Sequence, residues 1–320
     1  MKSSTATGTT ATAESQTRVH AGQTGNTPAV SPASAYRGRF APSPTGALHQ
    51  GSLLAALASW LDARAQGGAW IIRMEDLDAP RLVPGAAESI LATLARYGMA
   101  PDEPVLRQSM RAAAYLDALE VLRAKGLAYR CRCSRSEIQG PYSGRCRDLG
   151  LTDPDTAWRL RLEPDSVIAF DDGIQGHCEY RAAELGDPVL VRRDGIAAYQ
   201  LAVVVDDAFQ AITHVVRGAD LLESTAWQVA LIRALDLPVP RYTHIPLLTE
   251  PDGEKLAKSR SSAALDDAET IPTLVGTLAL LGLRLPLNLK AAGGSDILHC
   301  AVQHWDPGRL KGIRTLQLPR

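Results

Sequence analysis

The chain has 320 residues, of which 45% are hydrophobic and 22% charged, as expected of a globular protein with one large or two modest domains. Its 34 basic and 35 acidic residues give a formal net charge of −1, so a nucleic-acid partner would have to be held by local basic patches. The composition excludes collagen-like, coiled-coil and wholly disordered chains, and no apolar run reaches the about 20 residues that span a bilayer.

Residues 1–36 consist mainly of Ser, Thr, Ala and Gly, with almost no large apolar side chains. Such a segment cannot offset its ordering entropy by burial, so we expect a disordered tail. A transit peptide is the alternative, but the tail lacks the Arg-rich amphipathic pattern of one.

The first half of the remaining chain alternates strands with helices. The predicted elements are a strand at Gly38–Ala41, a helix at Ser52–Ala65, a strand at Ala69–Arg73, a helix between Pro84 and Gly98, and a helix at Met110–Lys125. Proline near the first turn and glycine past the last one are typical of helix ends.

The second half repeats this alternation. Leu201–Val205 and Ile212–Val216 are aliphatic runs that favour buried strands, followed by a helix at Leu221–Leu235 and a strand at His244–Leu248. The pattern predicts an α/β fold with a Rossmann-type doubly wound parallel sheet, formed by a catalytic domain at residues 37–248.

Two further regions interrupt or follow this domain. Residues 127–186 are rich in Arg, Cys, Gly and Pro and lack helical periodicity, so we expect an inserted subdomain. Residues 249–320 are expected to form a polar loop, Thr249–Asp267, and a short helical C-terminal region with an apolar helix at Ile271–Leu281.

The most informative motif is the string RFAPSPTGALHQGS at 39–52, which joins the first strand to the first helix. Backbone N–H groups and the positive end of the helix dipole make such a turn an anion site, and Gly51 lets a ligand approach the backbone. His49 and Ser52 add side-chain donors. The alternative is a proline-rich turn with a capping serine and a surface histidine.

Three of the five cysteines, Cys131, Cys133 and Cys146, lie close together in the insert. Three thiolates suit a zinc ion, and a structural zinc site needs a fourth ligand, for which His177 or Cys178 is available by pattern alone. The alternative is three reduced cysteines in a core, which the interleaved arginines disfavour. So few cysteines indicate a reducing compartment, and we expect a cytoplasmic protein.

Several ordered blocks resemble the catalytic domain of class I aminoacyl-tRNA synthetases of the glutamate type. The blocks are His49-Gln50-Gly51-Ser52 at the "HIGH" position, RMEDLD at 73–78, YQLAVVVDD at 199–207, VRGAD at 216–220, and KLAKS at 255–259, which is similar to the "KMSKS" loop. The sequence departs from the family pattern at Gln50, Ser52 and Leu256-Ala257. Ordered blocks are a strong signal, whereas the lysine loop alone is weak.

The resemblance implies that ATP activates an amino acid by positioning and charge neutralisation. It assigns catalysis to His49, Lys255 and Lys258, and ATP binding to His49, Gly51, Ser52 and Lys258, with Mg²⁺ on the phosphates.

L-glutamate needs a clamp for its carboxylates, and guanidinium groups supply one because they bind carboxylates in a bidentate way. Arg39 and Arg217 are the candidates, and a neutral amide would leave these cations unpaired. The resemblance places Glu75 against the substrate ammonium group and implies a pocket formed by Arg39, Phe40, Ala41, Pro42, Ser43, Glu75, Tyr199 and Arg217.

The spacing of the cysteines and Tyr142 resembles one branch of the family, in which a tyrosine oxygen completes the zinc shell. This resemblance makes Tyr142 the expected fourth ligand, with His177 in reserve.

Only residues 260–320 follow the lysine block, too few for an anticodon-reading domain. Together with the zinc pattern, this shortness resembles the branch that activates glutamate without tRNA and transfers it to queuosine in the anticodon loop of tRNA(Asp). The alternatives are a truncated enzyme that charges tRNA(Glu), a non-catalytic paralogue that binds glutamate or tRNA, and an adenylyltransferase of a small metabolite.

Overall fold

The structure is a computed structural model that describes residue 1 and residues 36–249, 265–286 and 293–317. The chain divides into residues 1–33 and a compact unit at 34–320, which holds all the elements named below. Nearly all of the predicted tail, and the lysine block with Lys255 and Lys258, lie outside the described residues.

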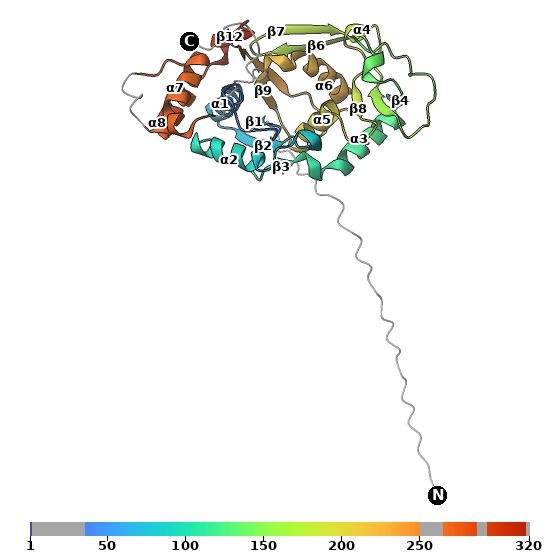
Figure 1. The fold of residues 1–320 in the computed structure, drawn as a ribbon, viewed down its shortest axis with the longest axis horizontal. Helices are drawn as coiled ribbons and strands as arrows, with labels where there is room; N and C mark the ends of the chain where they lie inside the picture. The colour runs from blue at the N-terminus through green and yellow to red at the C-terminus, as the bar shows by residue number, and fades with distance from the viewer. Residues whose placement is uncertain (2–35, 250–264, 287–292, 318–320) are drawn as a thin grey trace. The chain divides into compact units, whose positions relative to one another are not determined.

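A seven-stranded sheet forms the centre of the compact unit, in the order β3-β2-β1-β9-β10-β6-β7 (Figure 1). Neighbouring strands are parallel except for the edge pair β6 and β7, which is an antiparallel hairpin. The strands are β1 (Arg37–Phe40), β2 (Ala69–Met74), β3 (Leu106–Arg107), β6 (Val167–Asp172), β7 (Gly176–Arg181), β9 (His214–Gly218) and β10 (Arg241–Ile245).

Helices cover both faces of the sheet, as the doubly wound prediction requires. They are α1 (Gln50–Ala65), α2 (Ala86–Arg96), α3 (Ala112–Ala124), α4 (Ala182–Leu185), α5 (Tyr199–Phe209), α6 (Leu222–Ala234), α7 (Thr270–Leu280) and α8 (Gly294–Gln303). Short 3-10 turns lie at Ala79–Arg81, Gln108–Met110, Arg135–Glu137, Ala219–Leu221, Asp267–Glu269 and Pro307–Leu310.

Strand β2 separates two hydrophobic cores because successive side chains point to opposite faces. Trp70, Ile72 and Met74 pack into the core that contains α1, α2, α7 and α8. Ile71 packs into the core that contains α3, α5 and α6. Burial on both faces explains why the strand is a continuous apolar run.

The region expected to be a single insert at 127–186 contains two different structures. Strands β4 (Ala128–Cys131) and β5 (Ala157–Leu160) form a separate three-stranded antiparallel sheet with β8 (Val189–Val191), which lies beyond the expected end of the insert at residue 186. The β6–β7 hairpin instead extends the central sheet, because β6 pairs with β10. The amino-acid composition indicated that this region differs from the rest of the chain. It could not show which of its strands pair with a strand of the central sheet.

The predicted strand at Leu201–Val205 is wrong, because these residues lie in helix α5. Leu201, Ala202, Val203 and Val204 are all buried, since α5 packs between α3 and α6. A short aliphatic run buried on several sides has the same pattern in a helix as in a strand, so periodicity could not separate the two.

The C-terminal region is helical as predicted, with α7 and α8 packed on α1 (Figure 1). It also contains β12 (Thr315–Gln317), which pairs in parallel with β11 (Leu247–Thr249). This two-stranded sheet pairs residues 315–317 with the segment that directly follows β10. No helix in the described part of the chain is long and apolar enough to span a bilayer.

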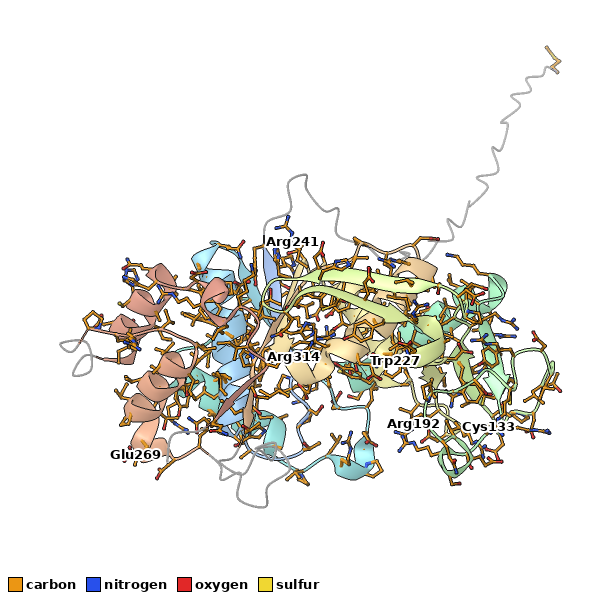
Figure 2. The ribbon with its side chains drawn as sticks, turned by 90° about the horizontal axis from the view of Figure 1, so that it is seen from above. Cys133, Arg192, Trp227, Arg241, Glu269 and Arg314 are labelled. Carbon is orange, nitrogen blue, oxygen red and sulfur yellow. The ribbon has the colours of Figure 1, made fainter. Side chains whose placement is uncertain are left out.

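The cysteine-containing insert and the C-terminal helices occupy opposite ends of the compact unit. Figure 2 shows Cys133, which follows β4, at one end and Glu269, which precedes α7, at the other. The central sheet lies between them, so the two regions extend from it in different directions.

Candidate active site

The sheet reverses its winding direction between β1 and β9. From β1 the chain proceeds through α1 to β2 on one side, and from β9 through α6 to β10 on the other. In doubly wound sheets, ligands bind at the carboxyl ends of the strands at such a switch point. A cavity of about 710 Å³ lies there, between the turn after β1, Gly218 at the end of β9, and the segment Ile245–Leu248.

The turn after β1 forms one wall of this cavity. Phe40, Ala41, Pro42, Ser43, His49, Gly51 and Ser52 all line it. The sequence-predicted nucleotide turn and four of the five residues of the predicted Arg39–Ser43 segment are therefore in one place.

His49 is the N-cap of α1. Its Nδ1 accepts hydrogen bonds from the backbone N–H groups of Gly51, at 3.1 Å, and Ser52, at 3.3 Å. Burial lowers the pKa of His49, which favours the neutral ring. Because Nδ1 accepts, the proton of the neutral ring is on Nε2, which lies 3.0 Å from Ser52 Oγ. The cap thus prepares Nε2 as a donor at the helix N-terminus.

Behind the same turn, buried ion pairs join β1, β2 and α5. Arg73 is fully buried and donates to Asp207 Oδ1 at 2.6 Å and to Glu75 Oε1 at 3.3 Å. Arg39, only 4% exposed, donates to both oxygens of Asp207, at 3.3 and 3.5 Å. Asp207 therefore holds two guanidinium groups at fixed positions.

The carboxyl groups of this cluster differ in their electrostatics. Burial opposes ionisation of Asp207, but Arg39 and Arg73 outweigh it and lower its pKa. Burial instead raises the pKa of Glu75, although Arg73 and Arg39 act in the opposite direction. The backbone N–H of Glu75 donates to Pro42 O at 2.9 Å, which fixes this residue beside the predicted glutamate segment.

Arg217, at the carboxyl end of β9, is 5% exposed and forms no ion pair within the described part of the chain. Its Nη2 donates to Thr225 Oγ1 and Gln228 Oε1, both at 2.7 Å, and its Nη1 to Tyr199 OH at 3.4 Å. Tyr199 is 37% exposed and has Arg217, Glu75 and Arg39 as electrostatic neighbours. Four side chains of the predicted glutamate pocket therefore lie near one another: Arg39, Glu75, Tyr199 and Arg217.

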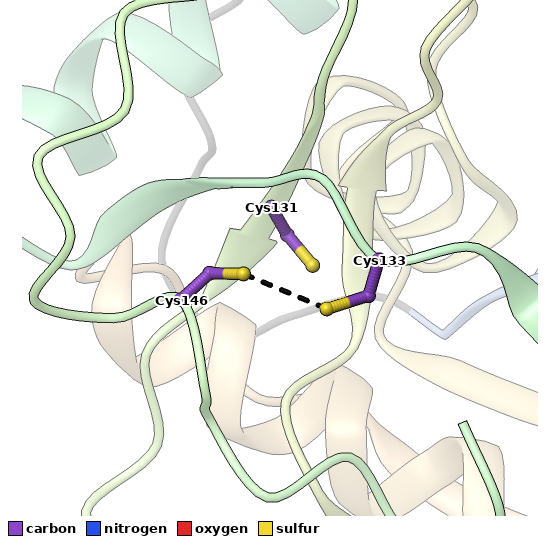
Figure 3. A group of neighbouring side chains, drawn as sticks. All are labelled: Cys131, Cys133 and Cys146. Atoms are coloured by element: carbon purple, nitrogen blue, oxygen red, sulfur yellow. Dashed lines mark hydrogen bonds between the residues drawn. The ribbon is translucent and has the colours of Figure 1, made fainter. Parts of the chain in front are cut away.

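The three cysteines of the insert also converge (Figure 3). The Sγ atoms of Cys131, Cys133 and Cys146 all lie within 4.8 Å of one another, and those of Cys133 and Cys146 are 3.5 Å apart. The hydroxyl of Tyr142 lies 3.2 Å from Cys131 Sγ and 3.7 Å from Cys133 Sγ. Burial opposes the thiolate of Cys146, but hydrogen bonds from Tyr142 and the Arg132 backbone help to lower its pKa to about 7.

His177, the reserve ligand, is elsewhere. It lies on β7, exposed, where Nδ1 contacts Asp171 at 2.7 Å and Nε2 contacts Glu179 at 3.1 Å. Cys178 is on the same strand and does not belong to the cysteine group found among the described residues. Of the donors weighed from the sequence, only Tyr142 accompanies the three thiols.

The sequence did not assign Arg73, Asp207 and His244 to the site. Arg73 and Asp207 belong to the recognised blocks, but they are partners that lie 134 residues apart. His244 was predicted only as part of a strand. Buried charged residues in otherwise apolar strands were the available signal, and it does not specify their partners.

The chain belongs to the class I tRNA synthetases for glutamate and glutamine. The family described as "tRNA synthetases class I (E and Q), catalytic domain" matches residues 35–145 and 145–273. This finding confirms the resemblance inferred from the sequence.

Within that family, the most informative relatives are named glutamyl-Q tRNA(Asp) synthetase. One from Pseudomonas aeruginosa (strain PAO1) is 51% identical over 287 residues, which cover 88% of this chain and 98% of the relative. One from Burkholderia cenocepacia (strain HI2424) is 55% identical over 286 residues, which cover 84% and 96%. Among solved structures, a glutamate tRNA ligase from Elizabethkingia meningosepticum, in complex with its amino acid, superposes with a TM-score of 0.75 at 27% identity, covering 89% of this chain and 67% of that one.

Proposed function

We propose that this chain activates L-glutamate with ATP and transfers the glutamyl group to queuosine in the anticodon loop of tRNA(Asp). The activation of glutamate is supported by the positions of Arg217 and Arg39. Both guanidinium groups are buried, and both are electrostatic neighbours of Tyr199, which is exposed to solvent. The second half is supported by the names of relatives that are at least half identical over most of the chain.

The charge of the pocket fits glutamate. Arg39, Arg73 and Arg217 oppose the carboxyl groups of Glu75 and Asp207, which leaves an excess of positive charge. Glutamate brings two carboxylates and one ammonium group, so its binding offsets that excess. Glutamine would leave a buried guanidinium group without an anionic partner, at a cost that discriminates strongly between the two.

In the activation step, a carboxylate oxygen of glutamate forms a bond to the α-phosphorus of ATP, and the bond from that phosphorus to pyrophosphate breaks. We assign to His49 Nε2–H, Ser52 and the backbone at Gly51 the role of holding phosphate oxygens at the N-terminus of α1. Lys255 and Lys258 are assigned the stabilisation of the growing charge, with Lys258 strongest in the transition state. Mg²⁺ would neutralise phosphate charge when bound with ATP.

In the transfer step, a hydroxyl of the queuosine cyclopentene diol attacks the activated carbonyl. An ester forms, the hydroxyl releases its proton to solvent, and AMP leaves with the electron pair of the anhydride bond. The product is glutamyl-queuosine on tRNA(Asp).

We further propose that Cys131, Cys133, Cys146 and Tyr142 hold one structural zinc ion. The donor set fits, because three sulfurs and one phenolic oxygen supply the four ligands of a tetrahedral zinc site. The three Sγ atoms lie within 4.8 Å of one another, and the Tyr142 hydroxyl lies 3.2 Å from Cys131 Sγ and 3.7 Å from Cys133 Sγ, which supports binding of a single ion by this group.

The cysteines, all in the described part of the chain, form no disulfide bonds, and the proposed substrate is a tRNA. Both points support a cytoplasmic location.

The decisive experiment measures exchange of labelled pyrophosphate into ATP, without tRNA, for each of the twenty amino acids. Exchange with glutamate alone is expected. Exchange with no amino acid would refute activation and would favour a non-catalytic paralogue.

The acceptor is tested separately with labelled glutamate and two RNAs, tRNA(Asp) that contains queuosine and tRNA(Glu). Labelling of tRNA(Asp), abolished when mild periodate has oxidised the diol, is expected. Labelling of tRNA(Glu) instead would establish the truncated tRNA(Glu)-charging enzyme.

A further inference from the structure

Arg217 depends on a buried histidine and carboxylate behind it. His244, on the neighbouring strand β10, is fully buried, and its Nδ1 lies 2.6 Å from Asp172 Oδ2. Its Nε2 lies 3.2 Å from Arg217 Nε and 2.9 Å from Thr225 Oγ1, a hydroxyl that also donates to Leu221 O at 2.9 Å. Asp172 ends strand β6, so the chain of contacts crosses three adjacent strands of the sheet.

The hydrogen bonds of Asp172 determine which nitrogen of His244 carries the proton. Oδ1 accepts the backbone N–H groups of Ile174, at 3.0 Å, and Gln175, at 2.8 Å, and the backbone N–H of His244 donates to both oxygens, at 3.1 and 3.0 Å. Such a carboxylate is ionised and can only accept. Nδ1 of His244 must therefore donate to it, and Nε2 of the neutral ring is left as an acceptor.

An acceptor at Nε2 is what Arg217 requires. Nε of a guanidinium group can only donate, and Nη2 of Arg217 already donates to Thr225 and Gln228. All of these partners are uncharged, so they fix the plane of the guanidinium group without neutralising it. In contrast, Arg39 and Arg73 each share the carboxylate of Asp207.

We propose that Asp172 and His244 are positioning residues for substrate recognition: Asp172 fixes the tautomer of His244, and His244 orients Arg217 as the uncompensated cation that binds a substrate carboxylate. The two residues touch no substrate themselves. The inference rests on the proposed activation of glutamate and goes beyond it, because it explains how one arginine of the pocket keeps its full charge for the substrate.

Two amide substitutions of His244 separate this role from a purely structural one. In His244→Gln, the longer side chain places an amide oxygen near the position of Nε2, so it can accept from Arg217 but loses the contact with Asp172. In His244→Asn, the amide can donate to Asp172 but does not reach Arg217. A control, His214→Gln, alters the half-buried histidine of β9 that stacks on Tyr36.

The readout is pyrophosphate exchange with the full chain, with KM measured for glutamate and for ATP. We expect His244→Asn to raise KM for glutamate by about tenfold or more, because a hydrogen bond to a charged group is lost, with KM for ATP within about twofold. His244→Gln is expected to remain within about threefold of the wild type for both substrates, and His214→Gln to match the wild type.

If His244→Asn leaves KM for glutamate unchanged, or if KM for glutamate and ATP rise together, the inference is overturned. Should His244→Asn not fold, as judged by circular dichroism, Gln228→Glu provides the second test. This variant offers Arg217 a carboxylate partner at a contact that is now 2.7 Å from a neutral oxygen. Gln228→Glu is expected to raise KM for glutamate and to leave KM for ATP unchanged. An unchanged KM for glutamate would refute the claim that the charge of Arg217 is left uncompensated for the substrate.

The wild-type protein separates a failure of the proposed function from a failure of the positioning role. Absence of glutamate-dependent exchange in the wild type contradicts the proposed function. If the wild type shows exchange and His244→Asn has an unchanged KM for glutamate, only the positioning role of His244 and Asp172 is contradicted.

Discussion

Arg73 donates a 2.6 Å hydrogen bond to Asp207, and both side chains are buried where β2 meets α5. Since Asp207 also accepts from Arg39, the pair fixes one guanidinium group of the proposed glutamate pocket from behind. The ionised carboxylate is therefore a structural requirement of the pocket as well as a contributor to its charge.

Asp207→Asn is expected to destabilise the protein by about 3 kcal/mol, because removal of one partner leaves buried charge uncompensated. KM for glutamate should rise as well, since Arg39 loses its fixed position. Denaturant unfolding and pyrophosphate exchange measure the two effects. Asp62→Asn is the matched control, because Asp62 is buried but accepts from the neutral groups of Tyr36 and Trp305.

The same substitution predicts a pH dependence with a definite sign. The pKa of Asp207 is lowered in the folded state, so its contribution is fully present above the ordinary aspartate pKa of about 4 and is lost as pH falls through the folded value. The difference in unfolding free energy between wild type and Asp207→Asn should be constant at neutral pH and shrink in acid. A difference that grows in acid would contradict the ionised pair.

Asp207 illustrates what the sequence could and could not predict. The motif around it was recognisable, but its aliphatic run is as typical of a buried strand as of the helix α5 that it forms. The contacts with Arg39 and Arg73 join residues 168 and 134 positions apart. Local periodicity carries no information about such partners, because the sheet order creates them.

Other parts were predictable because their signals are local. The strand, turn and helix around His49 follow from the motif and from the alternation of elements, although α1 begins at Gln50, two residues before the predicted start at Ser52, because His49 caps it. The cysteine spacing within residues 131–146 similarly predicted a cluster. The β6–β7 hairpin, in contrast, joined the central sheet because β10 offered an edge, which composition cannot show.

Arg217→Ala is expected to raise KM for glutamate by about ten- to a hundredfold, because a charge-assisted contact to the substrate carboxylate is lost. KM for ATP should change by less than about twofold. Initial rates of pyrophosphate exchange at varied glutamate and ATP measure this. Arg241→Ala, on exposed Arg241 of the adjacent strand, serves as control. Equal effects on both substrates would remove Arg217 from the glutamate pocket.

Cys133→Ser is expected to abolish retention of zinc and to destabilise the insert, since a structural metal contributes folding free energy. Zinc per chain, measured by atomic emission after dialysis, should fall from about one to near zero, while Cys300→Ser retains the metal. Tyr142→Phe keeps the ring but removes the hydroxyl, so it should lose zinc to a chelator faster than the wild type. Unchanged zinc content in Cys133→Ser would refute the proposed ligand set.

Lys258→Ala tests a residue outside the described part of the chain, so the expectation comes from the sequence. If Lys258 stabilises the charge that grows on the phosphates, its loss should lower kcat by about a hundredfold or more with a small effect on KM for ATP. Single-turnover formation of glutamyl-adenylate measures the step directly. Lys311→Ala, a substitution far along the chain from the lysine block, should leave the rate unchanged. A defect confined to KM for ATP would instead assign Lys258 to ground-state binding.

Gly51→Ala should impair the use of ATP through His49. A Cβ atom at Gly51 would lie 3.1 Å from Cε1 and 3.2 Å from Nδ1 of His49, closer than ordinary van der Waals contact. The imidazole ring must therefore move, which disturbs the hydrogen bonds that cap α1 and displaces the Nε2 donor. Misplacement of a catalytic group in this way lowers the reaction rate by about tenfold to a hundredfold. We expect kcat/KM for ATP to fall by that factor while KM for glutamate changes little. Gly276→Ala, in α7 with no atom within 4 Å of the new Cβ, is the matched control. Normal ATP kinetics in Gly51→Ala would show that the imidazole does not act from the position in which it caps the helix.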